Sequence, residues 1–226
     1  MLTPALRACA LTLPLALMTS AMAQDSKPAV TATSPDGSIL LTISTDNDSR
    51  PTWSLSRKGK LLIAPSKLGF LLTDGLNMTR GFSIIGSDKA SGKEKWEQPW
   101  GERRFITDHH NELLVRFRQS DVQGNRLMNI RFRLFDDGVG FRYELPEQPG
   151  LKTMRIADET TEFDIAPEGT AWWIPGGEWN RYEQVYQKTP IDAVSTAHTP
   201  ITMRLDDGTH VSFCLLYTSP SPRDRG

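Results

Sequence analysis

The amino-acid sequence predicts an all-β protein, a large antiparallel β-sandwich. Apolar and polar residues alternate with a period of two through most of residues 38–213, as in strands that cover a core on one side. Gly, Pro and Asp residues interrupt this alternation at short intervals, and almost no segment shows the three-to-four spacing of an amphipathic helix. Strands without crossover helices pair antiparallel, so two sheets packed face to face are expected.

The first strand is expected at residues 38–44, and residues 52–64 predict a hairpin around Lys58-Gly59. Residues 113–118 alternate in the same way. Further along, shorter alternating segments predict four more strands, at residues 161–165, 171–174, 201–205 and 210–213. Together with the hairpin described next, these segments supply the nine or more strands that a large sandwich needs.

The clearest alternation lies in residues 128–145, which predict a hairpin. Polar side chains such as Arg131 and Arg142 fall on one face, and Asp136-Asp137-Gly138 turns the chain, with Gly138 expected to supply a positive φ. The apolar side chains all fall on the other face: Met128, Ile130, Phe132, Leu134, Val139, Phe141, Tyr143 and Leu145.

The first 23 residues have the organisation of a secretory signal peptide. A single charge at Arg7 precedes an apolar run over residues 8–18, and the small-residue site Ala21-Met22-Ala23 follows. No cysteine stands directly after that site, so a soluble mature chain exported to the periplasm, without a lipid anchor, is expected. Residues 24–33 are interpreted as a polar leader and residues 34–213 as the sandwich domain.

The last residues have a different character. From Cys214 to Asp224 the sequence resembles one translated frame of a sequencing-library adaptor, so residues 214–226 are interpreted as an artefactual tail. The alternative is a disordered tail rich in Ser and Pro. Without both ends, the domain is mildly acidic and contains no cysteine. Nucleic acid and membrane are therefore not expected as partners, and a Cys nucleophile is excluded.

Common catalytic and metal-binding motifs are missing from the sequence. It contains no glycine-rich phosphate loop, no G-x-S-x-G elbow and no dinucleotide-binding fingerprint. No His-x-His or HExxH spacing occurs, so loop or surface positions are expected for the four histidines, His109, His110, His198 and His210. A run of acids is better explained as a charged strand edge than as a glycosidase acid pair: Asp158, Glu159, Glu162 and Asp164.

Residues 171–186 are rich in aromatic side chains, with polar residues between them. Aromatic faces beside amide, guanidinium and carboxylate groups suit a sugar ring, which stacks its C–H groups and directs its hydroxyls to polar partners. As an alternative, a strand here would turn Trp172 or Trp173 into the core. The break at Pro175-Gly176-Gly177 places the later residues on or after a loop. The candidate carbohydrate-binding residues are Trp172, Trp173, Trp179, Asn180, Tyr182 and Glu183.

Several motifs in this order resemble the N-terminal domain of glycoside hydrolase family 97, a bacterial family of α-glucosidases and α-galactosidases. Together they cover about residues 34–213. The matching motifs are Ser34-Pro35-Asp36-Gly37, Trp100-Gly101-Glu102, Asn111-Glu112-Leu113, the hairpin motif from Phe132 to Tyr143, Ala171-Trp172-Trp173-Ile174-Pro175, Tyr182-Glu183, Thr199-Pro200-Ile201-Thr202 and Gly208-Thr209-His210.

This resemblance implies a galactose-mutarotase-like super-sandwich, followed in the whole enzyme by a (β/α)₈ barrel that carries the catalytic carboxylates, and by a small sandwich. It implies an α-linked oligosaccharide or glycoside as substrate and Ca²⁺ near the active site. Cys214-Leu215-Leu216 stands where the family has a His-Glu-Ala-Ala-like stretch with a calcium-binding Glu. The chain is therefore expected to be non-catalytic, to bind no calcium alone, and to have the missing barrel as its partner.

Two other interpretations stay open at this point. One is a self-contained periplasmic carbohydrate-binding or mutarotase-like module, and the other is a structural interaction domain. A mutarotase needs a general acid and a general base in one cleft, typically a histidine with a carboxylate. His198 and His210 have no obvious carboxylate partner in the sequence.

Overall fold

The computed structural model of the chain describes residues 28–73, 77–121, 124–149, 151, 153–177 and 181–215. The predicted signal peptide, most of the predicted artefactual tail and the candidates Trp179 and Asn180 lie outside the described residues.

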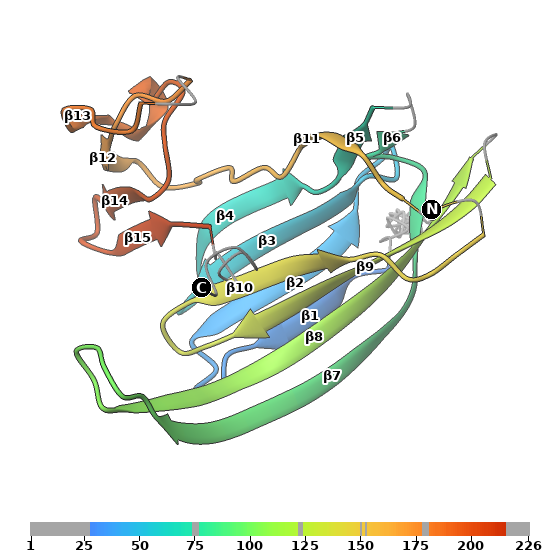
Figure 1. The fold of residues 1–226 in the computed structure, drawn as a ribbon, viewed down its shortest axis with the longest axis horizontal. Helices are drawn as coiled ribbons and strands as arrows, with labels where there is room; N and C mark the ends of the chain where they lie inside the picture. The colour runs from blue at the N-terminus through green and yellow to red at the C-terminus, as the bar shows by residue number, and fades with distance from the viewer. Residues whose placement is uncertain are drawn as a thin grey trace, which may run out of the picture.

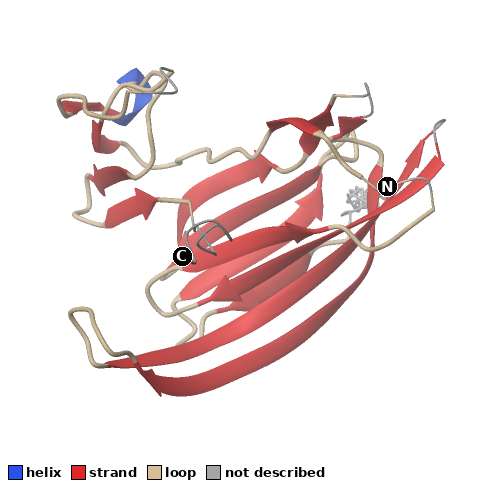
Figure 2. Ribbon diagram, in the orientation of Figure 1, coloured by secondary structure: helices blue, strands red, loops and turns tan. Residues whose placement is uncertain are grey.

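The regular secondary structure of the described residues is almost entirely strand, which confirms the all-β prediction (Figure 2). One short 3₁₀ turn, η1 (Ile191–Ala193), is present. The strands follow the chain as β1 (Val30–Thr33), β2 (Ile39–Thr45), β3 (Pro51–Arg57), β4 (Lys60–Lys67), β5 (Phe70–Leu72), β6 (Asn77–Met78), β7 (Phe82–Glu97), β8 (Phe105–Asp121), β9 (Gly124–Leu134), β10 (Val139–Glu144), β11 (Ile156–Glu159), β12 (Gly169–Trp173), β13 (Gln187–Pro190), β14 (Ile201–Leu205) and β15 (His210–Phe213).

Two four-stranded antiparallel sheets form the sandwich. One has the order β1-β2-β3-β4 and the other β10-β9-β8-β7. Figure 1 shows the sheet β11-β5-β6 at one end of the sandwich and the sheet β13-β12-β14-β15 at the opposite end, set apart from the rest. The last of these is called the small sheet below.

The core between the two large sheets is built from alternating apolar positions. Leu41 and Ile43 of β2 are fully buried, and so are Leu113, Val115 and Phe117 of β8. Each fully buried side chain of this kind contributes roughly 1.5–3 kcal/mol. The predicted inward face of β9 is confirmed, because four of its side chains have no exposed surface: Met128, Ile130, Phe132 and Leu134.

The β3–β4 hairpin has the predicted turn. Lys58 and Gly59 have φ values of 49° and 79°, and two consecutive left-handed residues match the twist of an antiparallel pair. The β9–β10 hairpin is also confirmed, with Leu134 opposite Val139. Its turn differs from the expectation, because Gly138 is not among the described residues with positive φ. Four residues close this loop, and the Phe135 amide donates to the Gly138 carbonyl at 2.8 Å.

Residues 161–165 are not a regular strand as predicted. This segment runs alongside β4 with separate hydrogen bonds, such as the Ala64 amide to the Asp164 carbonyl at 2.8 Å, and with one isolated bridge between Ile63 and Ile165. The strand lies earlier, at β11, which is the edge of its sheet and exposes its acidic residues. The predicted polar leader also contains β1 at its end, because Val30 and Ala32 pack against the core.

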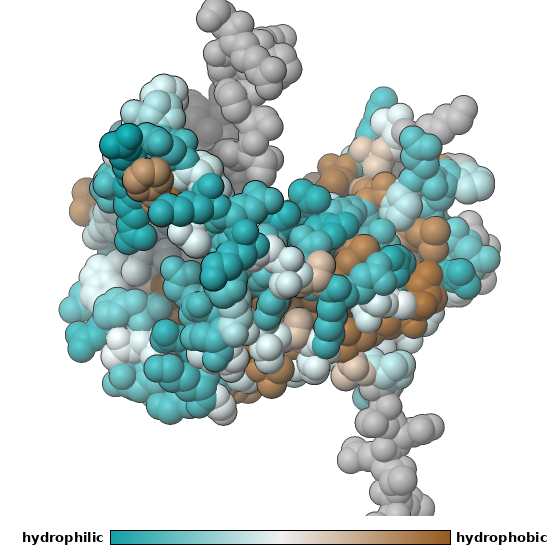
Figure 3. Space-filling view, turned by 90° about the horizontal axis from the view of Figure 1, so that it is seen from below, coloured by the Kyte–Doolittle hydropathy of each residue, from teal (hydrophilic) through white to brown (hydrophobic). Residues whose placement is uncertain are grey.

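Strands β7 and β8 form a hairpin much longer than the single strand predicted at residues 113–118. Strand β9 accompanies β8 only from Asn111 onward, so the far part of the hairpin projects as a two-stranded arm (Figure 1). Strand β7 exposes its free edge, and its many charged residues discourage pairing with another chain. Seen from below in Figure 3, hydrophilic side chains cover the left part of the molecule and apolar ones gather toward the right.

Replacing Phe132 by Ala removes a ring that is fully buried between the sheets. The substitution is expected to lower the free energy of unfolding by about 3–5 kcal/mol, measured by urea denaturation, because it leaves a cavity. Leu61→Ala, at a side chain that is 44% exposed, is the control and should change stability by less than about 1 kcal/mol. Equal losses in the two variants would show that the core lies elsewhere.

Candidate functional site

Strand β12 separates the two neighbouring tryptophans of the predicted site. Trp173 is only 4% exposed and packs with Ala171 and Met203 in the core of the small sheet. Its indole nitrogen donates to the Thr189 hydroxyl at 3.0 Å. The expected alternation of a strand therefore assigns Trp173 to the core, where it is not available to a ligand.

Trp172 points to the opposite face of the small sheet and is half-buried. Lys188 is its partner on β13, and the Lys188 ammonium lies 5.5 Å from the indole ring centroid. This distance is within the range of a cation–π contact. Trp172 is thus the member of the pair that a ligand can reach.

The chain leaves β12 through a tightly packed glycine. Pro175 forms an isolated bridge with Ala197, and the Gly176 amide donates to the Thr196 carbonyl at 2.9 Å. A Cβ atom at Gly176 would lie 3.0 Å from the Ala197 carbonyl carbon, so a larger residue would push the two segments apart. This contact anchors the start of the loop that carries the remaining candidates.

The described end of that loop brings Tyr182 onto His198. The two ring centroids are 5.2 Å apart, and the Tyr182 hydroxyl donates to the Thr199 carbonyl at 3.2 Å. Tyr182 remains 51% exposed, and Glu183 beside it is exposed. Within the described residues, the Nε2 atom of His198 is buried without a hydrogen-bond partner. The predicted residues therefore divide among a sheet face, a core and a loop.

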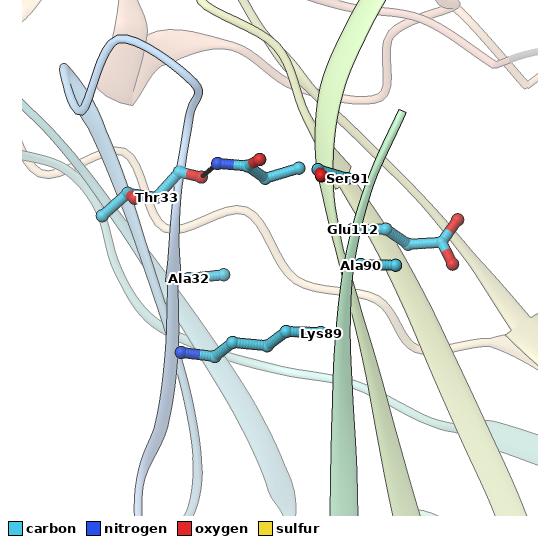
Figure 4. A pocket seen from close by; sticks show the side chains of 7 residues that line it. Ala32, Thr33, Lys89, Ala90, Ser91 and Glu112 are labelled. Carbon is cyan, nitrogen blue, oxygen red and sulfur yellow. Dashed lines mark hydrogen bonds between the residues drawn. The ribbon is translucent and has the colours of Figure 1, made fainter. Parts of the chain in front are cut away.

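Two hollows lie away from the predicted residues. The first, of about 370 Å³, lies between β1 and the β7–β8 pair, and Figure 4 shows Lys89 extending across it toward Ala32. The second, of about 400 Å³, lies between the β3–β4 hairpin and the small sheet. The Lys60 ammonium and the Asp207 carboxylate bridge these two parts at 2.9 Å, and the hydrogen bond from Lys60 lowers the pKa of Asp207.

A network of ion pairs covers the outer face of β8, β9 and β10. Arg131 donates from Nε to one oxygen of Glu144 at 2.6 Å and from Nη2 to the other at 3.1 Å, and it also pairs with Glu112. Its hydrogen bond lowers the pKa of Glu144. Burial raises the pKa of Glu112, but hydrogen bonds from Arg133 and Arg131 outweigh burial and lower it. Both carboxyl groups are therefore held ionised.

His110 corrects one expectation from the sequence. It lies on the opposite side of β8 from His109, as alternation predicts, but it is only 8% exposed rather than at the surface. Its Nδ1 pairs with the Asp108 carboxylate, and its ring packs against Phe135 at 5.5 Å between centroids. The spacing of the histidines among themselves does not reveal this pair, because the partner of His110 is Asp108, which alternation places on the same face of β8.

No metal site is formed by the part of the chain that the structure describes, since no three His, Cys, Asp or Glu side chains come together there. Within the same residues, no helix has the length and apolar character needed to cross a membrane.

Comparison with known proteins gives a consistent match. Residues 32–214 match the family described as Glycosyl-hydrolase 97 N-terminal. The chain is 31% identical over 121 residues to a probable retaining alpha-galactosidase of Streptomyces bingchenggensis (strain BCW-1), covering 54% of the chain and 18% of that protein. It is 22% identical over 196 residues to a retaining alpha-galactosidase of Bacteroides thetaiotaomicron, covering 82% of the chain and 28% of that protein.

Solved structures show the same relationship. Structures of a Glycoside Hydrolase Family 97 enzyme from Pseudoalteromonas sp. strain K8, in complex with panose and with acarbose, are both 43% identical with a TM-score of 0.76. Each match covers 81% of the chain and 28% of that enzyme. A beta-arabinopyranosidase at 24% identity and a TM-score of 0.70, matched over 81% of the chain and 31% of its own, shares the fold. The chain thus spans about a quarter of the length of these relatives.

Substitutions at the two neighbouring tryptophans are expected to differ in their effect on stability. Trp173→Ala should lower the free energy of unfolding by about 3 kcal/mol or more, because it empties the core of the small sheet. Trp172→Ala, at the half-buried position, should cost about 1 kcal/mol. Urea denaturation of both variants measures the difference, and a larger loss for Trp172→Ala would reverse the assigned orientation of β12.

The ion-pair network predicts a pH dependence of stability. Folding lowers the pKa values of Glu112 and Glu144, so their stabilisation is fully present above the unfolded value of 4.5 and is lost as the pH falls below it. The free energy of unfolding, measured by urea denaturation between about pH 6 and pH 3, should therefore decrease as the pH falls. Arg131→Gln should flatten this slope, whereas Arg118→Gln, on the same strand pair, should leave it unchanged. An unchanged slope in Arg131→Gln would contradict the pairing.

Proposed function

Because the chain belongs to the glycosyl-hydrolase 97 N-terminal family, we propose that it is the non-catalytic, carbohydrate-associated β-sandwich of a longer, secreted, calcium-dependent α-glycosidase. The observation that carries this proposal is the family match over residues 32–214, which runs from β1 through β15. The matching region makes up only 28% of the solved enzymes that share it.

Three ion-paired carboxylates of the described residues do not have the pKa shift of a glycosidase general acid. A glycosidase general acid needs a raised pKa so that it holds its proton near neutral pH. Glu112, Glu144 and Glu162 instead have lowered pKa values. For Glu162, burial raises the pKa, but hydrogen bonds from Lys67 outweigh it. These carboxylates act as ion-pair partners, and we assign the reactive carboxylates to a (β/α)₈ barrel in the longer protein.

The proposed substrate of the longer protein is an α-linked oligosaccharide or glycoside. The relative from Pseudoalteromonas was solved with panose and with acarbose. In this chain Tyr182 and Glu183, which precede β13, offer an exposed ring and an exposed carboxylate that suit a contact with a sugar. We propose that these two residues, with the candidates Trp179 and Asn180, contribute to one wall of the substrate pocket.

Calcium is assigned to the longer protein and not to this chain. Ca²⁺ takes six to eight oxygen ligands, most of them carboxylates and carbonyls. The described residues do not fit such a site, since no three acidic or histidine side chains meet among them. The signal peptide at residues 1–23 supports export of the protein to the periplasm.

A self-contained mutarotase-like module is the alternative. His110 and Asp108 are a histidine–carboxylate pair of the type that such an enzyme uses. However, the His110 ring is buried against Phe135, and neither residue lines one of the two hollows. The pair is therefore better explained as part of the sandwich.

A domain exchange tests the proposed function. Residues 28–214 should replace the matching region of the Pseudoalteromonas enzyme and keep its kcat/KM on an α-linked substrate within about tenfold, because the sandwich supplies a wall and not the reactive groups. Chelation should abolish this activity and added Ca²⁺ should restore it. The same exchange carrying Phe132→Ala is the control for a sandwich that does not fold.

Two results would contradict the proposal. The first is a well-folded exchange protein without activity. The second is the release of nitrophenol from nitrophenyl α-glucoside or α-galactoside by the 226-residue chain alone.

A further inference from the structure

The outer face of the small sheet gathers basic and hydroxyl side chains around one tryptophan. Strand alternation turns Ala171, Trp173, Met203 and Leu205 inward, where all four are buried. The side chains between them face outward, together with those of β13 and β15. We call this set the basic platform: Trp172, Lys188, Thr202, Arg204, His210 and Ser212.

The register of the sheet places these residues side by side. One row across the strands reads Lys188, Trp172, Thr202 and Ser212, from β13 through β12 and β14 to β15. Directly opposite residues on neighbouring strands have Cβ atoms about 4.5–5.5 Å apart, and a second row lies about 7 Å away along the strands. In that row Arg204 has His210 as its partner. The platform thus has the size of a short oligosaccharide.

The side chains of the platform are open to solvent and carry one sign of charge. Lys188, Thr202, Arg204, His210 and Ser212 are all exposed. Neither row contains a carboxylate. Two acidic residues, Asp206 and Asp207, lie beyond the end of β14 at the β14–β15 turn, and Asp207 is paired with Lys60.

The platform also has a place for the apolar face of a ligand. The Trp172 indole is half-buried in the centre of the sheet, with the Lys188 ammonium 5.5 Å from its centroid. The hydroxyl groups of Thr202 and Ser212 lie 3.3 Å apart next to it. An aromatic face that adjoins hydroxyl groups and cationic donors suits a sugar ring, which presents C–H groups to the indole and oxygen atoms at its rim.

We propose that the basic platform binds an acidic carbohydrate, one that carries a carboxylate or a sulfate group. Its ring stacks on Trp172, its anionic group accepts hydrogen bonds from Arg204 and Lys188, and its hydroxyls meet Thr202 and Ser212. Carboxylate and amide side chains are strong acceptors for the hydroxyl protons of neutral sugars, and the platform has neither, so its only side-chain oxygen acceptors are the Thr202 and Ser212 hydroxyls. Guanidinium and ammonium groups instead favour carboxylate and sulfate oxygens.

A long polyanion such as nucleic acid is a poorer fit. Its binding depends on many basic residues spread along a backbone, whereas this platform has three and the chain has a formal net charge of −1.

The proposed binding of an acidic carbohydrate does not depend on the barrel, the calcium ion or the α-glycosidase activity proposed above, because it rests on the small sheet alone.

Isothermal titration calorimetry of the full chain at low salt tests the proposal. Trigalacturonate, a sulfated disaccharide and neutral maltotriose serve as probes, and duplex DNA tests for general anion binding. At least one acidic sugar should bind about tenfold or more tightly than maltotriose, because its anionic group forms charge-assisted hydrogen bonds. The comparison of trigalacturonate with the sulfated sugar shows which acidic group the platform prefers.

Matched variants locate the site. Arg204→Gln and Lys188→Gln should each weaken binding of the acidic sugar about fivefold to tenfold. Trp172→Thr should weaken it by a similar factor, whereas Trp172→Phe should retain most of it. Arg118→Gln, an equal change of charge on β8, is the control and should have no effect. Circular dichroism and thermal melting confirm that each variant folds.

Four outcomes would overturn the proposal. These are equal affinity for maltotriose and the acidic sugars, no binding of any acidic sugar, unchanged affinity in folded Arg204→Gln and Lys188→Gln, or binding of duplex DNA as tight as that of the acidic sugars.

Discussion

The structure depends on the burial of one face of β8 and β9 against β2 and β3. The inward side chains of β8 and β9, from Leu113 to Leu134, have no exposed surface, and Trp53 of β3 packs on Phe141 at 5.5 Å between ring centroids. Because strand side chains alternate, this single burial also fixes what faces outward. It places the arginines of β9 beside the glutamates of β8 and β10, and so creates the ion-pair network on the outer face.

The small sheet is attached to this core through few contacts. Phe163 links the two parts, since its ring lies 5.4 Å from Trp53 and 4.7 Å from Phe213. The Lys60–Asp207 ion pair provides a second, exposed link. Among the described residues, the separate cluster of the small sheet has three buried members, Ala171, Trp173 and Met203. Residues with a proposed ligand role, such as Trp172 and Tyr182, therefore belong to a local unit with less burial, as is common for binding loops.

Sequence alternation predicted the fold where one face of a strand is buried and failed where neither face is. The β9–β10 hairpin alternates and was found with its core face, whereas β7 exposes both faces over most of its length and was missed. Alternation also identified that one of Trp172 and Trp173 must be buried. It did not find the neighbours of Trp172, because Lys188, Arg204 and His210 are brought together only by strand pairing between distant segments.

Native-state hydrogen exchange on the full chain tests most directly whether the small sheet opens independently of the sandwich core and is less stable than it. The amides of β8 and β9 should exchange only through global unfolding, while those of β12 and β14 should exchange through local opening at a clearly lower free energy. Equal protection of the two sheets, lost together in denaturant, would contradict this description of the molecule.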